Sequence, residues 1–177
     1  MLIDLLRARR SIRRFKDQPV EQEKLDLLLE VALRSPSSKG NNPWEFIVVT
    51  DRQRLDKLSV AKAHGATFLN GAPLAIMVCA DPAKSDVWVE DAAIAATLIH
   101  LEATDLGLGS CWVQIRLRER EDTTSSQAYL TDLMGLPPGM MVLAIIGIGY
   151  PMDSKSGHPH NTLCCNQVSY EKFGQRP

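Results

Sequence analysis

The stretch Leu74-Ala-Ile-Met-Val-Cys-Ala80 is a continuous run of apolar residues that directly follows Pro73. A run of this length and composition is typical of a β-strand that is buried on both faces. Residues 140–148 form a second run of this kind. Residues 44–50 (WEFIVVT) are aromatic and β-branched between Asn-Pro and Asp, which also predicts a strand. With a further strand at 108–115, the chain is expected to build a four-stranded buried sheet.

Helices are predicted around these strands, mainly from apolar residues at helical spacing. The expected ranges are 2–9, about 20–34, 51–61, 86–106 and 125–134. The longest of them has an Ala-rich face, which allows a neighbouring element to approach closely, so it is expected to be central. Residues 62–72 are expected to form an irregular or short helical connection. Strands that alternate with helices indicate an α/β or α+β protein.

The length of 177 residues suits a single domain spanning residues 1–177. Residues from about 151 to 177 show little periodicity, which predicts an extended C-terminal tail. Irregular stretches of this length are rare in compact monomers. We therefore expect this tail to extend onto a partner subunit.

Composition excludes several classes of protein. The 20 Lys+Arg residues balance 21 Asp+Glu, which argues against a globally basic nucleic-acid binder. The longest apolar stretch is interrupted by Glu90, Asp91 and Glu102, so no membrane span is expected. The four cysteines lack metal-site spacing and favour a reducing cytoplasm. For Cys164 and Cys165 a structural role is favoured over a redox role.

Basic residues are densest between Arg7 and Lys16, where no acidic residue occurs. Guanidinium groups hold phosphate bidentately, and the Ser11 hydroxyl adds a compact donor, so the segment suits a phosphomonoester. The same charges fit a basic surface that is simply exposed to solvent equally well. Binding to nucleic acid is a weaker interpretation, because only Phe15 is available for stacking.

The segment Ser35-Pro-Ser-Ser-Lys-Gly-Asn-Asn-Pro-Trp44 combines hydroxyls, amides and a glycine between a helix and a strand. These groups could face a polar heteroaromatic ring, or the segment could be only a polar turn. No phosphate-loop, dinucleotide or zinc-protease motif occurs, and no acid–base pair or nucleophile stands out. His100 is expected to be a core or interface residue. If the protein is an enzyme, a cofactor is therefore expected to carry out the difficult chemical step.

Four motifs in this order resemble the FMN-dependent nitroreductase family. They are RRSIRRF at 9–15, SPSSKGNNPWEF at 35–46, an Ala-rich helix ending in GLGSCW at 107–112, and IGYP at 148–151. The resemblance covers residues 2 to about 151. It implies an α+β fold with a central, mostly antiparallel sheet flanked by helices. It also implies a homodimer with FMN at the interface and the tail packed on the partner.

The resemblance also implies which residues contact the cofactor. The first motif would hold the phosphate and ribityl chain through Arg9, Arg10, Ser11 and Arg13. The polar turn would reach the flavin of the other subunit through Pro36, Ser37 and Ser38, with Gly40 and Asn42 nearby. A backbone N–H at Gln114 or Ile115 would lie close to flavin N5. One of Lys155, His158 and His160 in the tail would reach the phosphate.

The activity implied is hydride transfer from NAD(P)H through flavin N5 to a nitroaromatic, quinone or similar small acceptor, by a ping-pong mechanism. No catalytic side chain, metal, nucleic acid or membrane is required. Many relatives have Asn in place of Gly40 and Gln in place of Asn42, so side-chain contacts to the ring are expected to be fewer. Alternatives are a specialised flavin enzyme on the same scaffold, or an FMN-binding protein without activity.

Overall fold

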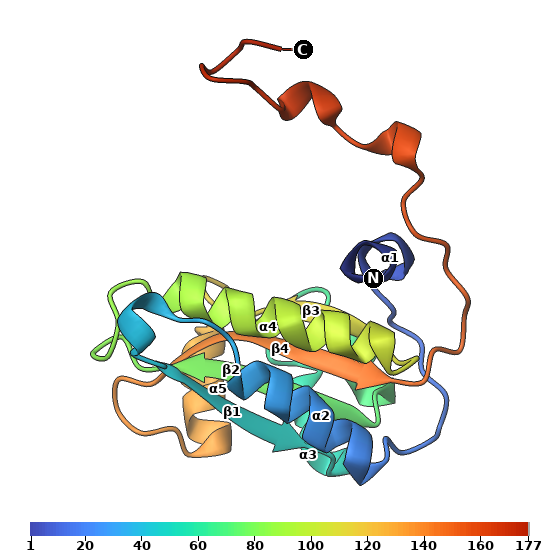
Figure 1. The fold of residues 1–177 in the computed structure, drawn as a ribbon. Coiled ribbons are helices and arrows are strands. Elements are labelled where there is room, and N and C mark those ends of the chain that lie inside the picture. Colours follow the sequence, from blue (N-terminus) through green and yellow to red (C-terminus); the bar gives the residue numbers. More distant parts are fainter. Residues whose placement is uncertain (177) are drawn as a thin grey trace.

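The computed structural model describes residues 1–176, which form a four-stranded sheet with helices on both faces (Figure 1). The strands are β1 (Trp44–Val49), β2 (Leu74–Ala80), β3 (Gly109–Gln114) and β4 (Met141–Gly149). Their order is β1-β2-β4-β3, and every neighbouring pair is antiparallel. The central strands β2 and β4 are almost entirely buried, as their apolar runs predict. The expected α+β class is confirmed.

The described residues form five α-helices. They are α1 (Leu2–Ala8), α2 (Gln22–Leu33), α3 (Arg52–Leu58), α4 (Trp88–Asp105) and α5 (Ser126–Met134). Helices α2 to α5 pack on the sheet, and α1 does not. One core cluster joins α2 and α4 to one face of the sheet, and a second joins α3 and α5 to the other face. The Ala-rich helix α4 is central, as expected, and contacts all four strands. Helix α3 ends at Leu58 rather than at residue 61, and short 3₁₀ turns follow at Thr67–Gly71.

The basic segment after α1 runs in extended form beside the start of β3. Ser11 forms a parallel bridge with Ser110, and the Ile12 N–H donates to the Ser110 carbonyl at 3.0 Å. Gly109 allows this close approach, because a Cβ there would lie 2.8 Å from Ile12 Cβ. Buried Ile12 therefore fixes the segment to the sheet, and the side chains on either side of it remain available for binding.

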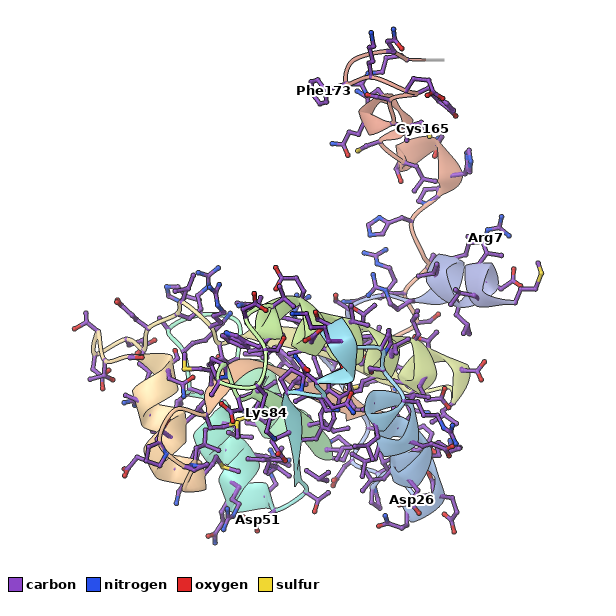
Figure 2. The ribbon with its side chains drawn as sticks, turned by 60° about the vertical axis from the view of Figure 1, so that its left-hand side comes forward. Arg7, Asp26, Asp51, Lys84, Cys165 and Phe173 are labelled. Carbon is purple, nitrogen blue, oxygen red and sulfur yellow. The ribbon has the colours of Figure 1, made fainter. Side chains whose placement is uncertain are left out.

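The C-terminal tail first follows this segment and then leaves the body of the molecule. Met152 N–H donates to the Arg14 carbonyl, and Gly157 passes so close to the Arg7 carbonyl that no side chain fits there. Beyond this point the tail carries two 3₁₀ turns, His160–Thr162 and Cys165–Gln167. Figure 2 shows Cys165 and Phe173 far from the sheet and its helices.

Apolar side chains in the tail are left without a core to pack on. Leu163, Val168 and Tyr170 are exposed, and Phe173 is 99% exposed. Helix α1 likewise buries none of its residues. Among residues 1–176, no helix is long and apolar enough to cross a membrane.

Candidate functional site

A small basic cavity lies at the junction of the N-terminal segment, β3 and the start of the tail. Its volume is about 180 Å³, and its lining includes Arg9, Arg10, Thr104, Asp153 and Lys155. The Asp153 carboxylate is already paired with Arg14 at 3.1 Å. Among the described residues, Arg9, Arg10 and Lys155 have no carboxylate within ion-pair distance; Arg10 donates to the Ser156 carbonyl instead. The cavity therefore has a surplus of positive charge.

The tail contributes one of its three candidate cations to this cavity. Lys155 lies in the lining, whereas His158 and His160 follow further along the exposed tail. The sequence left these three residues undecided, because it does not show where the tail turns away from the body. The structure brings Lys155 to Arg9 and Arg10, and we consider it the tail residue that can meet an anion there.

Further along β3, a buried thiol has several cations around it. Burial raises the pKa of Cys111, while nearby Arg13, Lys155 and Lys62 act in the opposite direction. Arg13 thus lies close to the strand. Lys62 was missed, because it is a lone cation in a connection without a motif. Burial and the nearby Arg118 charge lower the pKa of Lys62.

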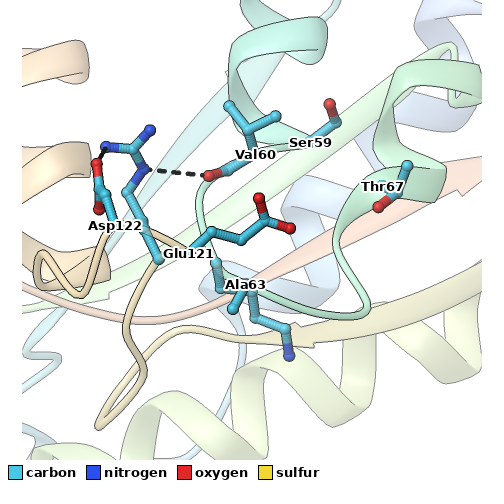
Figure 3. A pocket seen from close by; sticks show the side chains of 8 residues that line it. Ser59, Val60, Ala63, Thr67, Glu121 and Asp122 are labelled. Atoms are coloured by element: carbon cyan, nitrogen blue, oxygen red, sulfur yellow. Dashed lines mark hydrogen bonds and ion pairs between the residues drawn. The ribbon is translucent and has the colours of Figure 1, made fainter.

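Lys62 also lines a pocket of about 350 Å³ between the connection after α3 and the loop after β3 (Figure 3). The loop is held there by Arg120, whose Nε donates to the Val60 carbonyl and whose Nη1 pairs with Asp122. Glu121 lines the same pocket, so positive and negative groups balance in its wall. Nothing in this lining selects an anion, in contrast to the cavity at Arg9.

His100 is buried beneath the basic segment. Its Nδ1 lies 2.7 Å from Ser110 Oγ, and its ring stacks on Trp112 with centroids 6.2 Å apart. Burial, followed by the Arg9 charge, lowers the pKa of His100 to about 4. The imidazole is therefore neutral near pH 7, and it supports the strand from below, as expected of a core histidine.

The end of β3 leads into a tight turn. Ile115 is fully buried, and the N–H groups of Ile115 and Arg116 both donate to the Leu143 carbonyl at 3.1 Å. The Ile115 N–H is thus committed inside the sheet and is not a free donor, contrary to its proposed place beside a cofactor. The next N–H is that of Leu117, for which no acceptor occurs among the described residues.

The Gln114 side chain is also engaged within the protein. Its Oε1 accepts from Trp112 Nε1 at 2.9 Å, and its Nε2 donates to the Arg116 carbonyl at 3.1 Å. The Arg116 guanidinium lies 5.8 Å from the centre of the Trp88 ring. These contacts fix the shape of the turn. The residues involved are close in sequence. Their side-chain directions follow from the geometry of β3 and could not be predicted from sequence.

The polar turn Pro36–Asn42 lies at the other edge of the sheet, before β1. Buried Asp91 at the start of α4 accepts from Ser38 N–H at 2.8 Å and from Ser85 Oγ at 2.9 Å. Ser37 Oγ lies 2.8 Å from Asn42 Oδ1 and accepts from Asn42 N–H. The turn is thus rigidly built rather than a loose polar loop. Asp91 was not expected from the sequence, where it served only as a charge in an apolar stretch.

Lys39, Gly40 and Asn42 in this turn all have positive φ angles, of 54°, 69° and 46°. No atom lies within 4 Å of the position where Gly40 would carry a Cβ, so the glycine serves the backbone conformation and not a tight contact. Left-handed conformations at non-glycine residues are uncommon and often occur at functional sites.

The predicted site residues therefore fall into two groups. Arg9, Arg10, Ser11, Arg13, Gln114 and Ile115 lie along β3, whereas Pro36, Ser37, Ser38, Gly40 and Asn42 precede β1. Since β1 and β3 are opposite edge strands, three strand spacings, or about 14 Å, separate them. Among the described residues, no hydrogen bond or ion pair joins the two groups directly; the start of α4 lies between them, with Trp88 beside Arg116 and Asp91 bonded to Ser38 N–H.

The chain is similar to several known proteins. The family model described as "Nitroreductase family" matches residues 6–67 and 57–150. A solved structure of an FMN-dependent nitroreductase from Clostridium difficile R20291 is 46% identical, with a TM-score of 0.94, and the match covers 97% of this chain and 99% of that one. A sequence from Archaeoglobus fulgidus, provisionally named an NADH dehydrogenase/NAD(P)H nitroreductase, is 38% identical over 86% of this chain and 87% of its own. An FMN reductase [NAD(P)H] of Bacillus subtilis is 29% identical over 89% of this chain and 69% of its own.

Proposed function

This chain belongs to the nitroreductase family and is therefore an FMN-dependent NAD(P)H oxidoreductase, and we propose that it reduces nitroaromatic, quinone or similar small acceptors by a ping-pong mechanism. When bound, FMN supplies the redox chemistry by taking hydride at N5 from NAD(P)H and releasing it to the acceptor. The protein has to hold the phosphate, orient the ring and leave one face of it open.

The observation that carries this proposal is the cavity at Arg9. Three cations, Arg9, Arg10 and Lys155, line it without a carboxylate partner among the described residues. A phosphomonoester dianion supplies the missing counter-charge, and guanidinium groups bind phosphate oxygens with paired hydrogen bonds. The chain thus fits the phosphate end of FMN.

Beyond the cavity, the cofactor would extend along β3 past Arg13 to the turn after the strand. Ile115 N–H is already bonded to the Leu143 carbonyl, which leaves Gln114 N–H, the other donor expected from sequence, and Leu117 N–H in the turn. We assign the donor for flavin N5 to Leu117 N–H, which has no acceptor among the described residues. A fixed donor at the reacting atom needs no reorganisation during the reaction. The proposed mechanism requires no acid or base side chain.

The second half of each site would come from a second copy of the chain. The Pro36–Asn42 turn precedes β1, the edge strand opposite β3, and a flavin on β3 would meet such a turn from a partner. We therefore propose a homodimer with two sites, each built by both chains.

The tail gives this dimer its second contact. A groove of about 470 Å³ runs along the free edge of β1 and is lined by apolar side chains that include Leu29, Leu33, Trp44 and Phe46. The exposed tail carries matching apolar groups, above all Tyr170 and Phe173. We propose that each tail covers the groove of the other subunit, which would remove both apolar surfaces from water.

The first experiment is an absorbance spectrum of the purified protein, followed by anaerobic NADH and then NADPH. Flavin bands that bleach on addition of either nucleotide support the reductase. Bands that persist with both would favour an FMN-binding protein without this activity, and no bands after FMN addition would contradict cofactor binding. Initial rates with a quinone at several NADH concentrations should give parallel double-reciprocal lines; intersecting lines would contradict the ping-pong mechanism.

A further inference from the structure

The turn Ile115–Arg118 after β3 has an unfavourable residue at its third position. Arg118 N–H donates to the Ile115 carbonyl at 3.0 Å, which closes a four-residue turn. Within it Leu117 has a φ of 59°, whereas Arg116 has no positive φ. A positive φ at the third position alone is the mark of a type II turn, in which glycine is preferred there.

A leucine does not choose this conformation by itself. The left-handed region costs a residue with a Cβ about 1–2 kcal/mol. A type I turn between the same end points avoids this cost and differs mainly in the orientation of its central peptide. That peptide joins the Arg116 carbonyl to the Leu117 N–H, so a change of turn type would reverse the directions of both groups.

Gln114 holds this peptide in place. Its Nε2 donates to the Arg116 carbonyl at 3.1 Å, and this bond exists only while the carbonyl points toward β3. The amide cannot turn over freely, because its Oε1 accepts from Trp112 Nε1 at 2.9 Å. Trp112 in turn is held by the stack on buried His100. A chain of fixed contacts thus leads from the core to one peptide group.

We propose that Gln114 is a positioning residue which holds the Arg116–Leu117 peptide in the type II orientation and thereby directs the free Leu117 N–H, together with the exposed Leu117 side chain, away from the sheet. Leu117 is 76% exposed, and its N–H has no acceptor among the described residues. Strain in the turn is balanced by the Gln114 hydrogen bond.

The orientation of the Arg116–Leu117 peptide decides which of its two backbone groups faces the cofactor. In the observed orientation the turn offers a donor, whereas after reversal it would offer the Arg116 carbonyl, an acceptor. This consequence rests on the proposed function, but the orientation of the peptide does not. The two are therefore tested separately.

The test is the variant Gln114→Glu, which keeps the size of the side chain and an acceptor for Trp112 but cannot donate to the Arg116 carbonyl. The turn is followed by NMR in the protein without and with FMN. A type II turn gives a strong nuclear Overhauser effect between Arg116 Hα and the Leu117 amide proton. A type I turn instead gives a strong effect between the amide protons of Arg116 and Leu117.

We expect Gln114→Glu to shift the turn toward the type I pattern. When FMN is bound to this variant, the rate of FMN reduction by NADH should fall about tenfold, because one hydrogen-bond donor at the reacting atom is misplaced. The double variant Gln114→Glu/Leu117→Gly should return to the type II pattern and recover the rate, because glycine removes the cost of the left-handed conformation. Gln53→Glu on exposed α3 is the control and should change neither readout.

An unchanged type II pattern in Gln114→Glu, or no recovery in the double variant, would overturn the proposal. If Gln114→Glu does not fold, Trp112→Phe keeps the ring but removes the donor that fixes the Gln114 amide, and the same shift is expected. A wild-type protein that never takes up FMN would contradict the proposed function, while the NMR patterns would still decide the role of Gln114.

Discussion

Arg9 connects the surface cavity with the core beneath it. On one side it lines the cavity together with Arg10 and Lys155. On the other side its charge is one of the two causes that lower the pKa of His100, after burial. The same cation therefore favours an anion above it and a neutral imidazole below it.

Replacing Arg9 should weaken cofactor binding in particular. We expect Arg9→Ala to cost about 1.5–3 kcal/mol of FMN binding free energy, the range for a hydrogen bond to a charged group. Fluorescence titration with FMN measures this directly. Arg54→Ala is a matched control, because Arg54 is an exposed arginine on α3 whose side chain makes no recorded contact. Equal affinity in the two variants would contradict the phosphate site.

His100 should make the stability of the protein depend on pH. In the unfolded chain its pKa is about 6.5, whereas in the folded chain it is lowered to about 4. As pH falls from about 6.5 to about 4, His100 binds a proton in the unfolded state but remains neutral in the folded state. The free energy of unfolding should therefore fall by about 3 kcal/mol through this group, and be unaffected by it at higher pH.

Urea unfolding at a series of pH values measures this loss. The variant His100→Gln keeps a neutral hydrogen-bonding partner for Ser110 but has no proton to bind. The pH dependence of its free energy of unfolding should lack the His100 contribution. The difference in this free energy between wild type and variant should therefore narrow as pH falls. Two curves that stay parallel between pH 6.5 and 4 would show that His100 does not titrate in this way.

At the scale of elements, a single buried carboxylate determines the form of the Pro36–Asn42 turn. Asp91 is 3% exposed, belongs to α4, and accepts hydrogen bonds from Ser38 N–H and Ser85 Oγ. These bonds tie the turn before β1 to the helix that covers the sheet. The orientation of any group that the turn offers to a ligand therefore depends on α4.

Removing this anchor should loosen the turn and lower stability. Asp91→Ala leaves the buried Ser85 hydroxyl and the partly buried Ser38 N–H without an acceptor, and an unsatisfied buried group costs about 1–3 kcal/mol. We expect a loss of about 2–4 kcal/mol in the free energy of unfolding measured with urea. Asp91→Asn retains an acceptor for Ser38 and should lose less than half as much. Equal losses in the two variants would mean that packing, and not the hydrogen bonds, sets the role of Asp91.

Elements were predictable from sequence where local patterns decide them. The run Leu74–Ala80 is a strand with the predicted ends, and α3 begins directly after Asp51, which accepts from Arg54 N–H. What could not be predicted depends on contacts between distant segments. The Leu143 carbonyl takes up the Ile115 N–H, and Asp91 meets Ser38, because the fold brings them together. For the same reason Lys62 gave no signal in its own stretch of sequence.

At the scale of the whole molecule, the exposed apolar tail is the feature that tests the proposed dimer. Its apolar residues beyond Gly157 have no partner surface within residues 1–176, and the groove along β1 is open. A chain shortened after Thr162 should therefore run as a monomer in size-exclusion chromatography with light scattering, whereas the full chain should run as a dimer. A full chain that is itself monomeric would contradict the shared site.

The sharpest test of that shared site combines two damaged chains. Arg9→Ala removes a cation from the phosphate cavity of its own chain, and Asp91→Ala loosens the turn that its chain would offer to the partner. In a hybrid dimer of these two variants, one site has both defects, and the other has an intact cavity from one chain and an intact turn from the other. Hybrids isolated with two different tags should therefore bind one FMN per dimer with the wild-type affinity, although each parent dimer binds weakly. If each site were built within one chain, every site of the hybrid would carry one defect, and no binding at the wild-type affinity would be recovered.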